Sequence, residues 1–332
     1  MQKNDSILFT VITIKTNLIF VKTFKVKVFH SIFDFNPIGK TIITLGTFDG
    51  VHIGHKKIIS RLLKSAQIED LETVVITFAQ HPRNVLHSKE TVSLLNTVTE
   101  KTNLLESAGI DNLIILNFDN NLSELTGEEF VKNILVDQLN LQKIIIGYDH
   151  RFGKNRASDI HDLINFGKKY HFDVEQISAE EINEMTISST KIRNAIGQGD
   201  INLANLYLGY NYSFSGTVVK GNQLGRTIGF PTANILIEDP LKIIPGNGVY
   251  VVTGKWNDNI HQGMMNIGTK PTIDGKNLSI EVNFFGVNED LYGKEIEISV
   301  LDYLRKEQKF DSVESLKNQL SLDKKASLAY FG

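Results

Sequence analysis

The segment 46–55 (GTFDGVHIGH) constrains the fold most, because a glycine-rich loop there joins a strand-like run to a helix-like run. The preceding residues Thr41–Leu45 are apolar and β-branched, and Lys56, Lys57 and the apolar pair Ile58 and Ile59 follow. A strand that enters a helix through such a loop directs free backbone N–H groups and the positive end of the helix dipole at one place. The junction therefore predicts a βα unit with a site suited to phosphate.

Two histidines, His52 and His55, flank a glycine in this loop and could donate hydrogen bonds to a triphosphate. The pattern is an HxGH motif, and it differs from a P-loop because no Gly-Lys-Ser/Thr follows the glycines. A tight βα turn with two surface histidines is the alternative, which the preceding GTFDG makes less favoured. The other residues that we predict to contact a nucleotide here are Gly46, Phe48, Asp49 and Gly54.

From Val26 onward, strand-like runs alternate with helix-like runs. We expect strands at 41–45, 73–78, 113–116, 143–146 and 172–177. We expect helices at 55–66, 97–107, 127–139 and 158–170. This alternation predicts an α/β, Rossmann-like domain: a parallel sheet with helices on both faces, and ligands at the carboxyl ends of its strands.

The pattern changes near Tyr210, where short strand-like runs follow one another with Gly, Asn and Pro turns between them. These runs are 213–219, 249–256, 263–267, 278–285 and 295–301. Two helical patterns, at 312–320 and 324–330, end the chain. The C-terminal part is therefore predicted to be a small antiparallel β-barrel with terminal helices.

Composition limits the classes of function. A chain of 332 residues with 41% apolar residues fits two domains with real cores, and its net charge of −3 gives no reason to expect nucleic acid. Without cysteine, a divalent metal needs oxygen ligands, as Mg²⁺ prefers. The uncharged run 6–14 is far shorter than the ~20 residues of a spanning helix. We therefore expect a cytoplasmic protein with no membrane partner, and residues 1–27 as an extension of unknown role.

Two further segments of the N-terminal half are candidates for ligand contacts. Residues 187–193 (ISSTKIR) place hydroxyls and two cations at a predicted helix start, which suits phosphate oxygens and a departing pyrophosphate. An ordinary N-cap is the alternative: it is favoured for these hydroxyls taken alone, whereas the HxGH motif favours the ligand contact. Residues 147–154 follow a predicted strand and combine an acid, a cation and aromatic rings, which suits a flavin or a nucleotide base. A solvated charged loop is the alternative for that segment.

The C-terminal half has a second candidate phosphate site in 225–234 (GRTIGFPTAN). Thr232 and Asn234 are two residues apart, so in an extended segment their oxygens face the same side and could share one Mg²⁺. Gly221 and Gly225 would let the backbone approach a nucleotide closely. Residues 266–272 are expected to form a loop over the same site, and Glu281 could accept the proton of an attacking alcohol. A Gly/Pro-rich barrel turn and a surface glutamate are the alternatives.

Taken together, these motifs resemble those of the prokaryotic bifunctional riboflavin kinase/FMN adenylyltransferases, also called FAD synthetases. The resemblance runs from about Val28 to the C-terminus and includes both motif sets in the family's order. It implies an HxGH-type nucleotidyltransferase domain at 28–209 and a riboflavin kinase domain at 210–332. It also implies two reactions: phosphorylation of riboflavin to FMN by ATP, then transfer of AMP from a second ATP to FMN, giving FAD and pyrophosphate.

The resemblance also assigns roles to residues. In the kinase domain it implies Glu281 as the general base and Thr232 and Asn234 as ligands of Mg²⁺ and ATP. In the other domain it implies that His52 and His55 stabilise the transition state. The residues that it implies for the triphosphate are Ser188, Ser189, Thr190 and Arg193. The residues that it implies for flavin are Asp149, Phe152, Tyr292 and Arg305.

The sequence departs from the family pattern at four places. Asn283 stands where the family often has His, and residues 286–287 (GV) replace a usual acidic-aromatic pair. His150 stands where Phe is common, and Ser158 where Gly precedes Asp159. Two alternatives to the bifunctional enzyme follow. One is an enzyme that has lost one activity, most plausibly a weakened kinase given Asn283. The other is a flavin- or nucleotide-binding regulator, against which the intact catalytic motifs argue.

Overall fold

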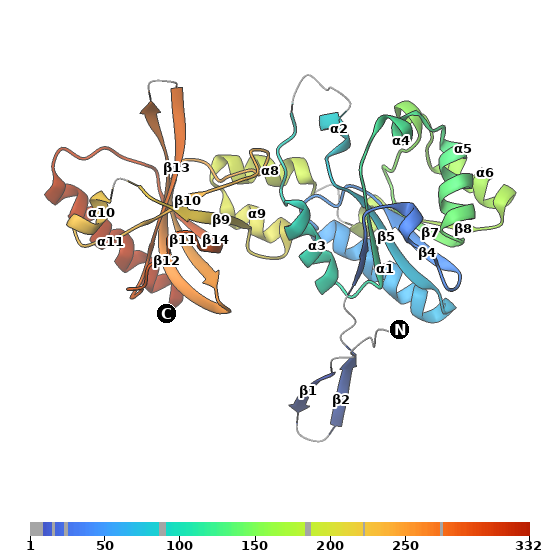
Figure 1. Cartoon of the computed structure of the whole chain (residues 1–332), viewed down its shortest axis with the longest axis horizontal. Coiled ribbons are helices and arrows are strands. Elements are labelled where there is room, and N and C mark those ends of the chain that lie inside the picture. The colour runs from blue at the N-terminus through green and yellow to red at the C-terminus, as the bar shows by residue number, and fades with distance from the viewer. Residues whose placement is uncertain are drawn as a thin grey trace. The chain divides into compact units, whose positions relative to one another are not determined.

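The computed structural model describes residues 9–14, 17–22, 26–85, 91–182, 187–221, 223–272 and 275–332. The chain divides into two compact units. Unit 1 comprises Met1–Val92 and Val98–Thr186, and unit 2 comprises Ser93–Thr97 and Ile187–Gly332 (Figure 1). Within the ranges described, no helix combines the length and the apolar character that crossing a bilayer requires.

A six-stranded sheet forms the centre of unit 1, with the strand order β3-β6-β5-β4-β7-β8 and parallel pairing throughout. Its strands are β3 (Lys27–Phe29), β4 (Thr41–Leu45), β5 (Glu72–Phe78), β6 (Asn112–Leu116), β7 (Leu141–Gly147) and β8 (Asp173–Ile177). The chain therefore steps from β4 to β5 on one side and returns to β7 on the other. The carboxyl ends of β4 and β7 border the crevice where open α/β sheets bind ligands.

Helices cover both faces of this sheet, which confirms the predicted α/β class (Figure 1). The helices and helical turns described between β4 and the end of unit 1 are α1 (Ile53–Glu69), α2 (Pro82–Val85), α3 (Val98–Ser107), α4 (Asn120–Glu124), α5 (Gly127–Glu129), the π-helix η2 (Phe130–Gln138), the 3₁₀ turn η3 (Lys154–Arg156), α6 (Ile160–Tyr170) and α7 (Ala179–Ile182). A further 3₁₀ turn, η1 (Ile32–Asp34), lies between β3 and β4. Successive strand residues point to opposite faces. Ile42 therefore belongs to the core cluster that contains Leu62 of α1, and Ile43 to the cluster that contains Leu135 of η2.

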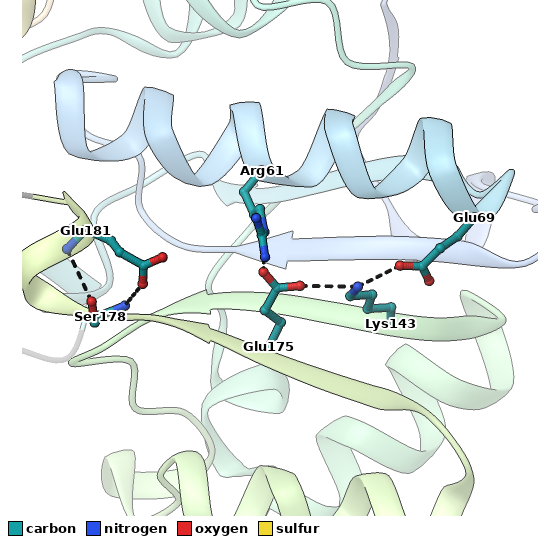
Figure 2. A network of polar contacts seen from close by, with 6 residues as sticks. All are labelled: Arg61, Glu69, Lys143, Glu175, Ser178 and Glu181. Carbon is teal, nitrogen blue, oxygen red and sulfur yellow. Dashed lines mark hydrogen bonds and ion pairs between the residues drawn. The ribbon is translucent and has the colours of Figure 1, made fainter.

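An ion network links α1 to the edge of the sheet (Figure 2). Lys143 of β7 lies between two carboxylates, 2.7 Å from Glu69 of α1 and 3.2 Å from Glu175 of β8. Arg61 of α1 donates to the other oxygen of Glu175. Lys143 and Glu175 are partly buried, and the network ties α1 to β7 and β8, so it orients the helix that begins at the HxGH loop.

Unit 2 contains a closed six-stranded barrel in the order β10-β13-β12-β11-β14-β9, closed by pairing of β9 with β10. Its strands are β9 (Ser213–Val219), β10 (Ala233–Leu236), β11 (Gly248–Trp256), β12 (Asn259–Thr272), β13 (Gly275–Phe284) and β14 (Glu295–Arg305). All pairs are antiparallel. The predicted small antiparallel barrel is thus confirmed, although the short strand β10 is an addition.

Two expectations for unit 2 were wrong. The helices expected at 312–320 and 324–330 are one continuous helix, α11 (Val313–Phe331), because its central polar residue Asp323 is buried against Arg305 and does not interrupt it. The loop expected at 266–272 continues strand β12. Residues of β12 beyond Ile267 pair with β13 alone, so they form a two-stranded extension of the barrel wall.

Three helices precede or interrupt the barrel: α8 (Ser189–Gln198), α9 (Ile201–Leu208) and α10 (Leu224–Thr227). Residues 187–209, which we predict to end the N-terminal domain, pack within unit 2. At the other end of the chain, β1 (Phe9–Ile14) and β2 (Asn17–Lys22) form an antiparallel hairpin within the extension.

Candidate functional site

The HxGH loop follows β4, the strand that lies between β5 and β7. The chain adopts left-handed backbone angles three times within it, at Phe48 (φ 47°), Gly50 (φ 87°) and Val51 (φ 33°). A β-branched residue such as Val51 rarely tolerates a positive φ. Phe48 and Val51 are nevertheless buried, so packing maintains the strained backbone. Strain of this kind concentrates at functional sites.

His52 and His55 lie in contact at the start of α1. Their rings stack with centroids 3.7 Å apart and an interplanar angle of 18°. His52 is the N-cap residue of α1, because its Nδ1 accepts the backbone N–H of His55 at 3.4 Å. In a neutral His52, the ring proton is therefore on Nε2. Gly54, between them, is buried in the first turn.

The electrostatic environment keeps His55 neutral. Burial lowers the pKa of His55 well below 6.5, and the neighbouring His52 and Lys101 lower this pKa further. Among the described residues, His55 Nδ1 is a buried atom without a hydrogen-bond partner. Such an atom in a phosphate-type loop is available to a ligand. His55 is thus suited to act as a neutral hydrogen-bonding group.

A buried lysine that sequence reasoning missed anchors this loop. Lys101 of α3 is 7% exposed, and its Nζ donates to the carbonyl oxygens of Thr47 (3.2 Å) and Phe78 (2.8 Å). Burial lowers the pKa of Lys101 to about 8, and the nearby carboxylate of Asp49 opposes this effect. The signal was present in the sequence, because Lys101 shares the inward face of its helix with Leu105, four residues later.

This lysine gives a prediction about stability and pH. In the unfolded chain the pKa of a lysine is about 10.4, so between about pH 8 and pH 10.4 the unfolded state binds more protons at this site. The free energy of unfolding of the wild type should therefore rise with pH in this window, relative to Lys101→Met, by up to about 3 kcal/mol. Urea unfolding of both proteins at pH 7.5, 8.5 and 9.5 measures the difference. If the difference in free energy of unfolding between the two proteins did not change with pH, the lowered pKa of Lys101 would be contradicted.

The segment after β7 contains the predicted flavin residues Asp149 and Phe152. Asp149 is exposed, whereas Phe152 is 7% exposed and belongs to the core cluster with Phe130. His150 stacks against Phe152, with ring centroids 5.9 Å apart, and burial lowers the pKa of His150 to about 4. The structure therefore shows a packing role for Phe152, and its contact with flavin stays a prediction.

The ISSTKIR segment lies in unit 2. Ser188 is the N-cap of α8 and accepts the backbone N–H of Lys191 at 3.3 Å, so the capping alternative describes this serine. Ser189 is partly exposed and Thr190 is exposed. Arg193 is held by a 2.6 Å bond from its Nε to the carbonyl oxygen of Ser93. Triphosphate binding by these residues stays a prediction.

In the barrel, β10 and β13 bring three predicted residues together. Asn234 lies opposite Glu281 in the antiparallel ladder, so their side chains share one face. Thr232 lies two residues before Asn234, and its Oγ1 donates to Glu281 Oε2 at 3.4 Å. Ser279, which sequence reasoning missed, donates to the other carboxylate oxygen at 3.1 Å. The expected clustering of Thr232, Asn234 and Glu281 is thus present.

Two glycines permit the chain to pass close to this cluster. A Cβ at Gly221 would lie 2.2–2.5 Å from the side-chain amide of Asn234. A Cβ at Gly225 would lie 2.2 Å from the carbonyl oxygen of Phe230 and 3.5 Å from Thr232 Oγ1. Only glycine fits either position without displacing a neighbour. The two glycines therefore shape the surroundings of the hydroxyl and amide groups.

The cluster fits Mg²⁺ in its donor chemistry. Hydroxyl, amide and carboxylate oxygens are hard ligands, and Mg²⁺ is commonly bound through few protein groups plus substrate phosphates. The described residues contain no group of three or more His, Cys, Asp or Glu placed to hold a metal. A metal at this site would thus depend on Thr232, Asn234 and phosphate oxygens.

The remaining predicted flavin residues of the barrel are already engaged in contacts. Arg305, the last residue of β14, forms two bonds with Asp323 of α11, at 2.8 and 2.6 Å. The hydroxyl of Tyr292 accepts a bond from Gln223 at 3.3 Å, and this tyrosine is 37% exposed. Arg305 therefore ties the terminal helix to the barrel in this structure, and its contact with flavin stays a prediction.

Comparisons with known proteins match both units. The family model for FAD synthetase matches residues 36–191, and the model for riboflavin kinase matches residues 208–331. A bifunctional riboflavin kinase/FMN adenylyltransferase of Buchnera aphidicola is 38% identical over 297 residues, covering 89% of this chain and 94% of its own length. The protein of the same description from Bacillus subtilis is 36% identical over 299 residues, covering 88% and 93%.

A relative from Escherichia coli K12, also described as a bifunctional riboflavin kinase/FMN adenylyltransferase, is 34% identical over 294 residues, covering 88% of this chain and 93% of its own length. Among solved structures, a crystal structure described as a macrolide-efflux protein from Streptococcus pneumoniae matches with a TM-score of 0.84 at 32% identity. The match covers 91% of this chain and 98% of that chain. The efflux description applies to that protein.

Proposed function

Because this chain belongs to the bifunctional riboflavin kinase/FMN adenylyltransferase family, we propose that it makes FAD in two ATP-dependent steps at two separate sites. The kinase site is formed by β10 and β13 of the barrel. The adenylyltransferase site is formed by the HxGH loop and the segment after β7. The observation that carries this assignment is the grouping of Thr232, Asn234 and Glu281 on one barrel face, in a unit different from that of the two histidines.

At the kinase site, the 5′-hydroxyl oxygen of riboflavin attacks the γ-phosphorus of ATP, and ADP leaves. Glu281 accepts the proton of the attacking hydroxyl, and Ser279 holds one oxygen of this carboxylate. Thr232 and Asn234 would hold Mg²⁺, which neutralises charge on the transferred phosphate when it is bound. Gly221 and Gly225 let the nucleotide approach the backbone. We propose that Arg305 and Tyr292 contact the flavin here.

At the adenylyltransferase site, a phosphate oxygen of FMN attacks the α-phosphorus of a second ATP, and pyrophosphate leaves. The substrate phosphate is itself the nucleophile, so no protein nucleophile is needed. His52 and His55 donate hydrogen bonds to the transition state, and the lowered pKa of His55 supports a neutral ring at that position. The residues of unit 1 that we propose to hold the nucleotide are Gly46, Phe48, Asp49 and Gly54, and triphosphate binding by Ser188, Ser189, Thr190 and Arg193 stays a prediction. Asp149 and Phe152 are proposed to contact the flavin.

We further propose a functional division at 28–209 and 210–332, a cytoplasmic location, and no nucleic-acid or membrane partner. Residues 1–27 precede these two domains as an extension to which no role is assigned. Incubation with riboflavin, ATP and Mg²⁺, followed by separation of products over time, tests the order of the two steps. FMN should appear before FAD. A protein that forms no FMN from riboflavin would instead have lost its kinase activity, which is the alternative suggested by Asn283.

We expect Gly221→Ala to impair FMN formation selectively. The added methyl group would lie within 2.5 Å of three side-chain atoms of Asn234, so the amide must leave its present position on the face that it shares with Glu281. Loss of a well-placed group of this kind lowers rates by about 10–100-fold. Initial rates of FMN formation and of FMN-to-FAD conversion measure the effect.

Gly197→Ala is the matched control, because a Cβ at that position meets nothing within 4 Å. It should leave both activities unchanged. Equal FMN formation by Gly221→Ala and Gly197→Ala would contradict the placement of Asn234 in the kinase site.

A further inference from the structure

Alternate residues of β13 form a polar row along one face of the barrel strand. Ser279 and Thr232 each donate to one carboxylate oxygen of Glu281, at 3.1 and 3.4 Å. Two residues beyond Glu281, the side-chain Nδ2 of Asn283 donates to the carbonyl oxygen of Pro231 at 2.6 Å. The row therefore reaches from the proposed base to the segment that carries Thr232.

The bond to Pro231 lies where the strand ladder ends. Backbone pairing of β10 with β13 consists of Asn234 with Glu281 and Ala233 with Val282. Thr232 and Pro231 precede β10, and proline has no N–H with which to continue a ladder. The side-chain amide of Asn283 therefore holds the backbone at Pro231, one residue before Thr232.

The surroundings of Asn283 make this bond important. Its side chain is 6% exposed, and its backbone pairs with Met264 of the neighbouring strand β12. A buried amide or carbonyl left without a partner costs about 1–3 kcal/mol, so the Asn283 amide and the Pro231 carbonyl stabilise one another's position. On the other side of Pro231, the N–H of Phe230 donates to the carbonyl oxygen of Gly225 at 2.8 Å. Both ends of the short segment before Thr232 are therefore fixed.

We propose that Asn283 is a positioning residue of the kinase site, whose side-chain amide holds Pro231 and thereby sets Thr232 against Glu281. The proposal rests on the proposed function, since it takes Thr232 and Glu281 as parts of the phosphoryl-transfer site. Asn283 acts through Thr232 and does not itself touch the substrate. Its presence is then compatible with full kinase activity, because the asparagine amide supplies the N–H donor that the bond to Pro231 needs.

Two substitutions of Asn283 distinguish the effect of its N–H donor from the effect of its side-chain volume. Asn283→Leu has a similar size and no donor, whereas Asn283→His keeps an N–H. FMN formation is measured at saturating riboflavin while Mg²⁺ and ATP are varied. The leucine variant should need about 10-fold more Mg²⁺ for half-maximal rate and should lose about 10–100-fold in kcat/KM for ATP. The histidine variant should remain within about threefold of the wild type, which is small beside that loss.

FMN-to-FAD conversion, measured in the same samples, is the control and should not change. An unchanged Mg²⁺ requirement in Asn283→Leu, or equal losses in the leucine and histidine variants, would overturn the proposal. If Asn283→Leu and the smaller Asn283→Ala both lost adenylylation as well, Asn283 would serve the fold and the proposal would be wrong. Glu281→Gln is assayed in parallel: if it still formed FMN, the kinase site itself would be misassigned, which is a different failure.

Discussion

Glu281→Gln is expected to abolish FMN formation from riboflavin and to leave FMN-to-FAD conversion unchanged. The substitution preserves the size of the side chain, and glutamine can still form hydrogen bonds with Thr232 and Ser279. It removes the carboxylate that accepts a proton. General-base catalysis contributes about 10²–10⁴-fold, so the rate of FMN formation should fall by that factor. Separate assays started from riboflavin and from FMN measure the two activities.

Glu297→Gln is the matched control for this prediction. Glu297 lies on β14 of the same barrel and is exposed, so its neutralisation changes the net charge equally without touching the proposed site. The control variant should behave as the wild type in both assays. If Glu281→Gln formed FMN at the rate of the control, Glu281 would not be the base.

His52→Ala is expected to have the opposite effect: it should lower FMN-to-FAD conversion by about 10²–10³-fold and leave FMN formation intact. The imidazole is a preorganised donor in a buried loop, and its ring stacks on His55 at 3.7 Å. Its loss removes transition-state stabilisation at the α-phosphorus. Initial rates with FMN and ATP as substrates measure the effect.

The N-cap role of His52 requires its own control, because losing a cap destabilises a helix by about 0.5–2 kcal/mol. Asparagine is a strong N-cap residue, so His52→Asn should restore the start of α1 without restoring the imidazole. It should remain impaired in adenylylation. His161→Ala, at an exposed position of α6, serves as a second control and should leave both activities unchanged. Recovery of activity in His52→Asn would mean that capping, rather than donation to phosphate, explains the loss.

The main elements of the fold could be predicted from local patterns. Alternation of apolar runs and helical patterns predicted the parallel sheet, and β9 was placed at its observed bounds. The four residues of β10 were missed because Pro231 and several glycines precede them, and such residues are typical of turns. The helix α11 was divided in two because Asp323 reads as a polar interruption until its partner Arg305 is known.

The parts of the candidate sites that could be predicted are those formed by residues close to one another in the sequence. Thr232 and Asn234 share a face through strand geometry alone, and the histidine pair follows from a loop that opens a helix. Lys101 was missed because its partners are backbone carbonyl oxygens of other segments. Ser279 was missed although it lies on the same strand as Glu281, two residues before it. The bond from Asn283 to Pro231 joins two segments that are distant in the sequence, so it required the structure. The lowered pKa of His55 likewise depends on burial, on His52 and on Lys101, which lies on the separate helix α3.

Complementation between two inactive proteins tests the central claim of two independent sites most directly. Glu281→Gln and His52→Ala are incubated with riboflavin, ATP and Mg²⁺, separately and as a mixture, and FAD is quantified over time. Each variant alone should form almost no FAD, whereas the mixture should form it after a lag, as FMN released by His52→Ala is consumed by Glu281→Gln. If the mixture formed no more FAD than the sum of the separate variants, although FMN accumulated in it, two independently acting sites would be contradicted.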